Sequence, residues 1–239
     1  MSISCPSLIG SHYPDLCVAV DHYCERVSSA LNAEPLNALT NVAFLLAAWG
    51  AWRLCSKYPS AKTSGLIRAL ISIMMIIGLG SFLFHTVATR WAEWADVLPI
   101  MVFMLLYLWL VLTMFFGWSI WLKFIGLGVY FAVTFYLEAA VPGTFLWGGA
   151  LYVPTLLLMI AIVIALYWYR SRAADAILAA TIVFLLSFTV RTLDVEVCSV
   201  LSVGTHFLWH LLNAILLYIL VRAAIVHAAP VTGEQRSDP

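Results

Sequence analysis

Seven apolar segments, each long enough to cross a lipid bilayer, divide this sequence. They cover residues 36–54, 65–87, 95–116, 119–139, 148–169, 173–192 and 203–226. About 20 apolar residues in a helix span the roughly 30 Å hydrocarbon core of a bilayer. Lipid cannot hydrogen-bond to an exposed backbone, so such segments cross the membrane as helices. The sequence therefore predicts an all-α membrane protein, a bundle of seven transmembrane helices.

The composition agrees with this fold class. Of the 239 residues, 64% are hydrophobic and 10% are charged, against roughly 45–50% and about 25% in soluble proteins. The formal net charge is zero, so no nucleic-acid partner is expected. Residues 1–33 lack the basic and apolar regions of a signal peptide. We expect them to form an extramembrane segment, residues 34–227 the transmembrane domain, and residues 228–239 a disordered tail.

The 12 lysines and arginines are distributed unevenly between the two predicted sides of the membrane. The side that holds the N-terminus has three of them, Arg26, Arg90 and Arg191. The opposite side has Arg53, Lys57, Lys62, Arg68, Lys123, Arg170, Arg172, Arg222 and Arg236. The positive-inside rule then predicts an outer N-terminus and a cytoplasmic C-terminus. If the protein is bacterial, we expect it in the inner membrane, with any outer site facing the periplasm.

The last apolar segment contains two histidines, His206 and His210, at a spacing of four residues. Residues four apart share a helix face, and an imidazole pair can hold a first-row metal ion such as Zn²⁺. No glutamate follows His206, so this is not the HExxH motif of zinc proteases. Both rings could instead hydrogen-bond to neighbouring helices, and the pair alone does not decide between these roles.

The other polar residues of the apolar segments fall at the same predicted end of the bundle. Odd segments begin on the outer side and even segments end there. The polar residues are Glu34, Asn37 and Asn41 near the start of the first segment, Ser81 and His85 at the end of the second, Asp96 at the start of the third, and Arg191 and Asp194 around the end of the sixth. Ionisable groups within a bilayer are costly and usually functional.

Three histidines, a carboxylate and a hydroxyl are the parts of a catalytic zinc site. The imidazoles would hold the metal, water would take the fourth position, and Asp96 would accept a proton from that water. Plainer roles are also open. His85 could bond to another helix, Asp96 could cap its helix or pair with Arg191, and Ser81 could bond to its own helix backbone.

These residues lie in motifs that resemble the alkaline ceramidase family, part of the CREST group of seven-helix membrane hydrolases. The motifs, in family order, are Cys24-Glu25, Glu34-Pro-Leu-Asn37-Ala-Leu-Thr-Asn41, Gly80-Ser81-Phe-Leu-Phe-His85, Asp96 with Leu98-Pro99, and Gly204-Thr205-His206-Phe-Leu-Trp-His210. The resemblance implies a zinc ion on the three histidines, with Ser81 and Asp96 around its water. It also implies hydrolysis of ceramide to sphingoid base and fatty acid.

A calcium site before the first helix is also implied by the resemblance. Glu25 and Glu34 match carboxylates of the family, and Asp21 lies one residue farther from the Cys-Glu pair than the family pattern has it. Val27 stands where the family has an asparagine. Calcium prefers six to eight oxygen ligands. A calcium site at Asp21, Glu25 and Glu34 and an ordinary acidic loop therefore both remain open.

The resemblance further implies a disulfide, because the family pairs the cysteines that correspond to Cys24 and Cys198. Cys5 and Cys17 share the same predicted side and could form a second bridge.

We therefore expect a zinc-dependent amidohydrolase that acts on a ceramide-like lipid within the membrane. Asp96 would be its general base and Ser81 an oxyanion donor, with Asn37, Asn41, Arg191 and Asp194 as supporting polar residues. One alternative is a seven-helix receptor or carrier with a structural metal, in which Asp96 is a fourth ligand. Another is a hydrolase of a different acyl lipid, such as an ester.

Overall fold

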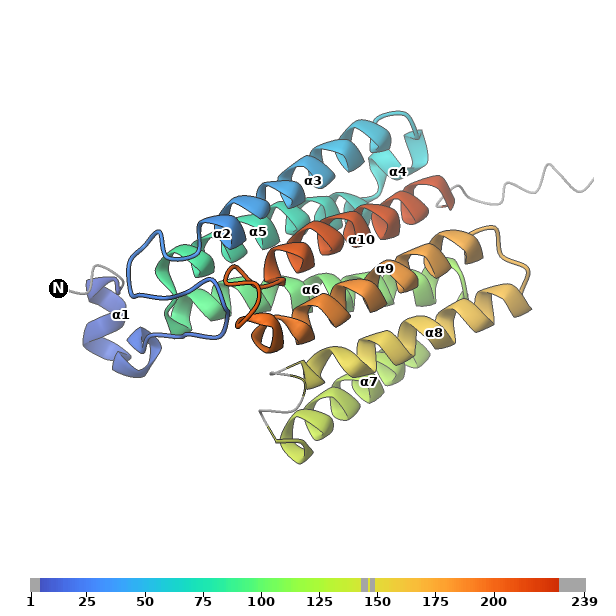
Figure 1. Ribbon diagram of the computed structural model, residues 1–239. Coiled ribbons are helices and arrows are strands. Elements are labelled where there is room, and N and C mark those ends of the chain that lie inside the picture. Colours follow the sequence, from blue (N-terminus) through green and yellow to red (C-terminus); the bar gives the residue numbers. More distant parts are fainter. Residues whose placement is uncertain (1–4, 143–145, 147–148, 228–239) are drawn as a thin grey trace, which may run out of the picture.

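The protein is a bundle of long helices, seen in a computed structural model that describes residues 5–142, 146 and 149–227 (Figure 1). Seven helical segments are long and apolar enough to cross a membrane. The described residues contain no β-strand, only an isolated bridge between Ala19 and Thr89. The predicted all-α, seven-helix fold class is thus confirmed. The tail predicted at residues 228–239 lies outside the described residues.

The helix bounds follow the predicted segments closely. The seven spans are α2 with α3 (Pro35–Thr40 and Val42–Cys55), α5 (Gly65–Val87), α6 (Arg90–Met114), α7 (Ile120–Ala140), η3 with α8 (Ala150–Tyr152 and Val153–Trp168), α9 (Ala174–Leu193) and α10 (His206–His227). Shorter elements are α1 (Ser7–His12), η1 (Pro14–Cys17), α4 (Pro59–Thr63) and η4 (Val195–Val197). Helix α6 begins five residues before the predicted segment. The prediction followed apolar residues and therefore left out the first turn of this helix, which carries polar ones.

A glycine and a capping serine separate α6 from α7. Gly117 has a φ of +62°, a conformation that glycine adopts at little steric cost, and it ends the run after α6. The Ser119 side chain then accepts a hydrogen bond from the Leu122 amide and caps α7. The predicted break between the third and fourth spans is therefore present.

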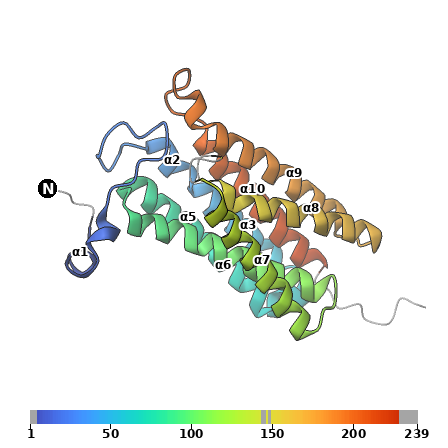
Figure 2. The same ribbon diagram turned by 90° about the horizontal axis from the view of Figure 1, so that it is seen from below.

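Helix α10 is the centre of the bundle, and α7 lies at its edge (Figures 1 and 2). α10 packs against α3, α5 and α9, while α5 packs along α6. Most apolar side chains of α10 on these faces are buried, whereas Thr134 is the only buried residue described in α7. The two histidines of the last segment thus start the most enclosed helix of the protein.

The N-terminal segment folds back over the end of the bundle at which α10 begins (Figure 1). The Val20 amide donates to the Ala88 carbonyl and the Arg90 amide donates to the Val18 carbonyl, which ties the segment to the turn between α5 and α6. Disulfides join Cys24 to Cys198 and Cys5 to Cys17. The first of these links the segment to the loop between α9 and α10.

Candidate metal centre

Three histidines from two helices meet at this end of the bundle. His85 lies in the last turn of α5, and His206 and His210 lie in the first turns of α10. One ring nitrogen from each lies within 4.8 Å of the others, and each residue is no more than 2% exposed. Of the groups of histidine, cysteine and carboxylate residues in the described part of the chain, only this one is compact enough to share a metal ion.

Asp194 fixes the start of α10. Its Oδ1 accepts hydrogen bonds from the amides of Thr205, at 2.6 Å, and His206, at 2.8 Å. Its Oδ2 accepts one from the Cys24 amide at 3.0 Å. Gly204 has a φ of +63°, and a Cβ there would collide with the Asp194 carboxylate. A carboxylate at a helix N-terminus satisfies free amides and complements the helix dipole, so Asp194 sets where His206 begins the helix.

Two of the three rings are oriented by a hydrogen bond at Nδ1. His85 Nδ1 lies 2.6 Å from Glu34 Oε2, and His210 Nδ1 lies 2.9 Å from Thr40 Oγ1. The Thr40 hydroxyl lies 2.8 Å from the Leu36 carbonyl and donates to it. Its oxygen is therefore free to accept from His210. Both partners thus favour the tautomer with a proton on Nδ1 and a lone pair on Nε2.

The ring nitrogens that carry free lone pairs are available to bind a metal ion. His85 Nε2, His210 Nε2 and His206 Nδ1 are buried and have no hydrogen-bond partner in the part of the chain that the structure describes. Buried polar atoms without a partner are unfavourable and rare in folded proteins. A set of neutral imidazoles with free lone pairs is what a first-row metal ion such as Zn²⁺ requires. These three residues fit a metal.

Tyr23 holds the third ring. It stacks on His206 with ring centroids 3.6 Å apart and an interplanar angle of 21°. Burial raises the pKa of Tyr23, so its phenol stays neutral beside the histidines. Tyr23 and Thr40 were not assigned from the sequence. Thr40 lies within the first-helix motif and Tyr23 directly precedes Cys24. Their nearness to these motifs was the only feature of the sequence that could have pointed to a role at the site.

Ser81 and Asp96 lie beside each other on α5 and α6. Ser81 is buried, Asp96 is half-buried, and both side chains line the same cavity. A Cβ on Gly80 would collide with the Ala95 carbonyl, so only glycine permits this close helix contact. Pro99 has no amide hydrogen to donate to that carbonyl four residues earlier. The Gly-Ser pair and the later proline therefore bring the hydroxyl and the carboxylate together.

A family model described as Ceramidase matches residues 19–238, which is most of the chain. The chain belongs to the ceramidase family. A search of curated proteins found no match. Membership in the ceramidase family implies a membrane-embedded hydrolase that acts on the amide bond of a lipid, ceramide. The seven apolar helices agree with a multi-pass membrane protein.

Two cavities of this ceramidase-family protein meet beside the histidines. The outer one is the more polar of the two, and its lining includes Tyr23 and His206. The inner one contains Ser81 and His210 and is otherwise lined mainly by apolar side chains as far as Leu220. Ten residues of helix separate His210 from Leu220, about 15 Å along the axis. The residues shared by both cavities include Asp96, Tyr152 and Trp209.

The remaining predicted supporting residues include Arg191, which lines the outer cavity, and two buried asparagines. The Arg191 guanidinium lies over the rings of Tyr152, at 5.4 Å, and Trp209, at 5.7 Å. Such cation–π contacts hold the charge at the wall of the outer cavity. Asn37 donates to Glu34 Oε2 at 3.1 Å, and Asn41 donates to the Asn37 carbonyl at 2.9 Å. The asparagines therefore support the carboxylate that orients His85.

The carboxylates expected to bind calcium have other contacts. Both oxygens of Glu25 accept backbone amides at the start of α2, from Leu36 at 2.7 Å and Asn37 at 2.8 Å. Both oxygens of Glu34 are also engaged, one by Arg26 and one by His85. Asp21 is exposed. As arranged, these three residues do not fit the oxygen-rich shell that calcium prefers.

Arg26 is the third functional residue that sequence reasoning missed. Burial opposes ionisation of Glu34, but the hydrogen bonds from His85 and Asn37 and the charge of Arg26 together lower the pKa of this carboxyl. An arginine in an N-terminal loop is usually a solvated surface charge, so no pattern in the sequence pointed to a role for Arg26.

Proposed function

We propose that this protein is a zinc-dependent amidohydrolase that cleaves a ceramide-like lipid into a sphingoid base and a free fatty acid. Family membership supports the amide hydrolysis. The observation that carries the metal dependence is the set of three buried imidazoles, His85, His206 and His210, whose free ring nitrogens have no hydrogen-bond partner among the described residues. The proposed hydrolase domain covers residues 34–227.

The residue set favours zinc. Three imidazole ligands with room for a further ligand are typical of catalytic zinc sites, whereas calcium and magnesium prefer oxygen. When bound, Zn²⁺ supplies Lewis acidity that polarises a carbonyl and makes water a nucleophile near neutral pH.

Asp96 is the proposed general base. It lies where the two cavities meet, within reach of a substrate amide placed there. A carboxylate in this position can take a proton from attacking water and return it to the leaving amine. Ser81, which lies beside Asp96, can donate its hydroxyl proton to the oxygen on which negative charge develops.

The cavities support a lipid with a polar head and a long chain. The apolar inner cavity between α6, α8, α9 and α10 fits a hydrocarbon chain, and the polar outer cavity fits the hydroxyl groups of a ceramide. An amide between them would lie beside Asp96.

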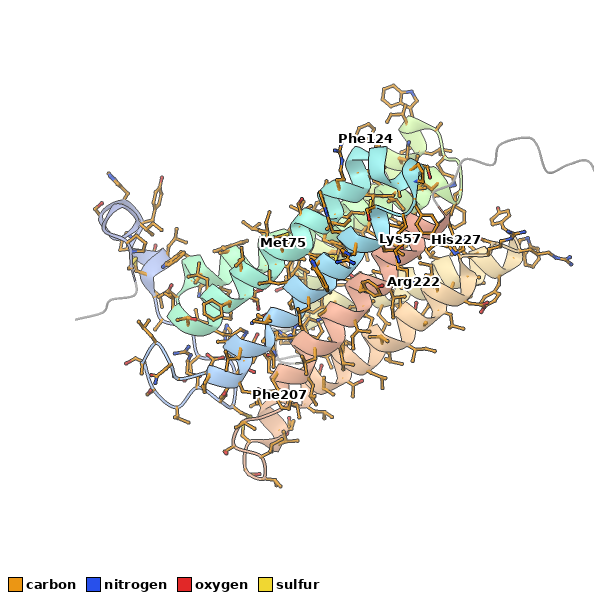
Figure 3. All side chains as sticks on the ribbon, turned by 90° about the horizontal axis from the view of Figure 1, so that it is seen from above. Lys57, Met75, Phe124, Phe207, Arg222 and His227 are labelled. Carbon is orange, nitrogen blue, oxygen red and sulfur yellow. A yellow bond between two sulfur atoms is a disulfide. The ribbon has the colours of Figure 1, made fainter. Side chains whose placement is uncertain are left out.

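We place the site toward the outer face of the membrane. Lys57, Arg222 and His227 lie at the end of the bundle opposite Phe207, the neighbour of the metal histidines (Figure 3). The distribution of cations supports an outer N-terminus and a cytoplasmic C-terminus. In a bacterial inner membrane the site would face the periplasm.

Two substitutions test this function against a structural metal. Asp96→Asn keeps the size but cannot accept a proton, so it should retain the metal while fatty-acid release from ceramide falls about 10²–10⁴-fold. Ser81→Ala should also retain the metal and lose about 10²–10³-fold. The measurements are metal content by mass spectrometry and fatty-acid release.

Asp175→Asn is the matched control, because Asp175 accepts a hydrogen bond from Tyr167 at the other end of the bundle. This variant should keep both its metal and its fatty-acid release. A receptor or carrier with Asp96 as a fourth ligand gives another pattern. The Asp96 variant would then lose metal, and the parent protein would release no fatty acid. An ester hydrolase would release fatty acid from acyl esters but not from ceramide.

A further inference from the structure

The geometry points to a new role for Arg26: its guanidinium is a built-in cation that orients metal ligand His85 through Glu34, in the place where the resemblance implied calcium. Arg26 is a positioning residue, since it touches no reacting group. The inference rests on the proposed function only in taking His85 as a metal ligand.

Arg26 is enclosed although it belongs to the N-terminal segment. It is 8% exposed and donates in three directions. Its Nε binds Glu34 Oε1, one terminal nitrogen donates to the His85 carbonyl at 3.1 Å, and the other donates to the Ser28 carbonyl at 3.2 Å. A buried arginine with three partners has one defined position, because its planar fork matches carboxylate and carbonyl acceptors.

Glu34 transmits this position to the metal ligand. Arg26 holds one carboxylate oxygen, and the other accepts from His85 Nδ1 at 2.6 Å and from Asn37 at 3.1 Å. A second-sphere carboxylate of this kind sets the tautomer and the plane of a ligating imidazole. Arg26 therefore holds His85 at two points, directly at its backbone carbonyl and through Glu34 at its ring.

Charge balance explains why a cation is required here. Glu34 is 3% exposed, and a buried carboxylate is strongly unfavourable without a counter-charge. Neutral His85 does not supply that charge, whereas arginine is always protonated. The carboxylates that might have gathered calcium are Glu25, which caps α2, and Asp21, which is exposed. Arg26 thus supplies the positive charge from within the chain.

The first test is a calcium titration of the purified full-length protein. Zinc affinity and unfolding temperature should stay unchanged up to about 1 mM Ca²⁺, a range that covers weak extracellular calcium sites. Terbium, a luminescent probe for calcium sites, should give no saturable signal. Calcium-dependent stabilisation of the parent protein would overturn the inference. None of these readouts requires ceramide hydrolysis, so they can succeed even if the proposed activity is wrong.

The second test removes the guanidinium. Arg26→Ala should weaken zinc binding about 10–100-fold, as expected for loss of second-sphere support. Millimolar guanidinium ion should restore part of the loss, while the same concentration of sodium should not. Arg53→Ala is the control, because Arg53 lies over Trp49 at the opposite end of the first span. Unchanged zinc affinity in Arg26→Ala would contradict the proposed role.

A double variant covers the case in which Arg26→Ala fails to fold. Arg26→Met combined with Glu34→Gln removes both charges and leaves neither one buried alone. If Arg26 acts through Glu34, the double variant should bind zinc as tightly as Glu34→Gln alone, within about threefold. Fully additive losses would show that Arg26 acts independently of Glu34 and would overturn the relay.

Discussion

Two of the three histidines that could hold a metal ion are oriented in different ways. His85 is held by a buried carboxylate, Glu34, whose charge is balanced by Arg26. His210 is held by one neutral hydroxyl, that of Thr40. Both arrangements place the proton on Nδ1, but only the carboxylate also makes its imidazole more basic. A hydrogen bond to a charged carboxylate is expected to hold an imidazole more firmly than one to a neutral hydroxyl. The carboxylate also requires a second residue, Arg26, to balance its charge.

The difference extends to where each support comes from. Thr40 is part of α2 and needs only the packing of that helix against α10. Arg26 comes from the N-terminal segment, which is joined to the loop between α9 and α10 by the Cys24–Cys198 disulfide. The charged support therefore depends on structure outside the seven apolar helical segments, and the neutral support does not.

The largest effect should come from removing the rings themselves. His85→Ala, His206→Ala and His210→Ala should each lose the metal and abolish hydrolysis, because three protein ligands are the minimum for a catalytic zinc site. Metal content and fatty-acid release are the measurements. His227→Ala, near the opposite end of α10, is the control (Figure 3). Metal retained in any of the three variants would remove that histidine from the ligand set.

Removing the charge of Glu34, the support of His85, should have the next largest effect. Glu34→Gln can still accept from His85 but leaves Arg26 buried without its carboxylate. We expect about 100-fold weaker zinc binding, measured by competition with a chelator. Glu93→Gln is a matched control, because Glu93 also pairs with a histidine, His22, but outside the metal site. If both variants bind zinc equally well, the charged support has no special role.

The smallest effect should come from the neutral support. Thr40→Val keeps the shape of the side chain but removes the acceptor for His210 Nδ1. We expect about 10-fold weaker zinc binding in the same chelator competition, at the low end for a second-sphere partner. Thr189→Val is the control, since its exposed hydroxyl donates to the Leu185 carbonyl, four residues earlier in its helix, in the same way. A loss larger than that of Glu34→Gln would reverse the comparison.

The sequence was sufficient for the fold class and for the gathering of polar residues at one end. Span length and apolar composition are local properties, and the helix bounds follow them closely. Once the spans alternate in direction, the position of each polar residue along its helix decides which end it occupies. The i, i+4 spacing likewise implied that His206 and His210 share a face.

Only the tertiary structure decided which groups touch. Thr40 lies 170 positions from His210 in the sequence, and Arg26 lies 59 positions from the His85 carbonyl that it binds. Such contacts depend on the rotation and close approach of packed helices, which a single sequence does not encode locally. For the same reason the sequence left calcium open at Glu25 and Glu34, while the fold commits Glu25 to backbone amides and Glu34 to an arginine and a histidine.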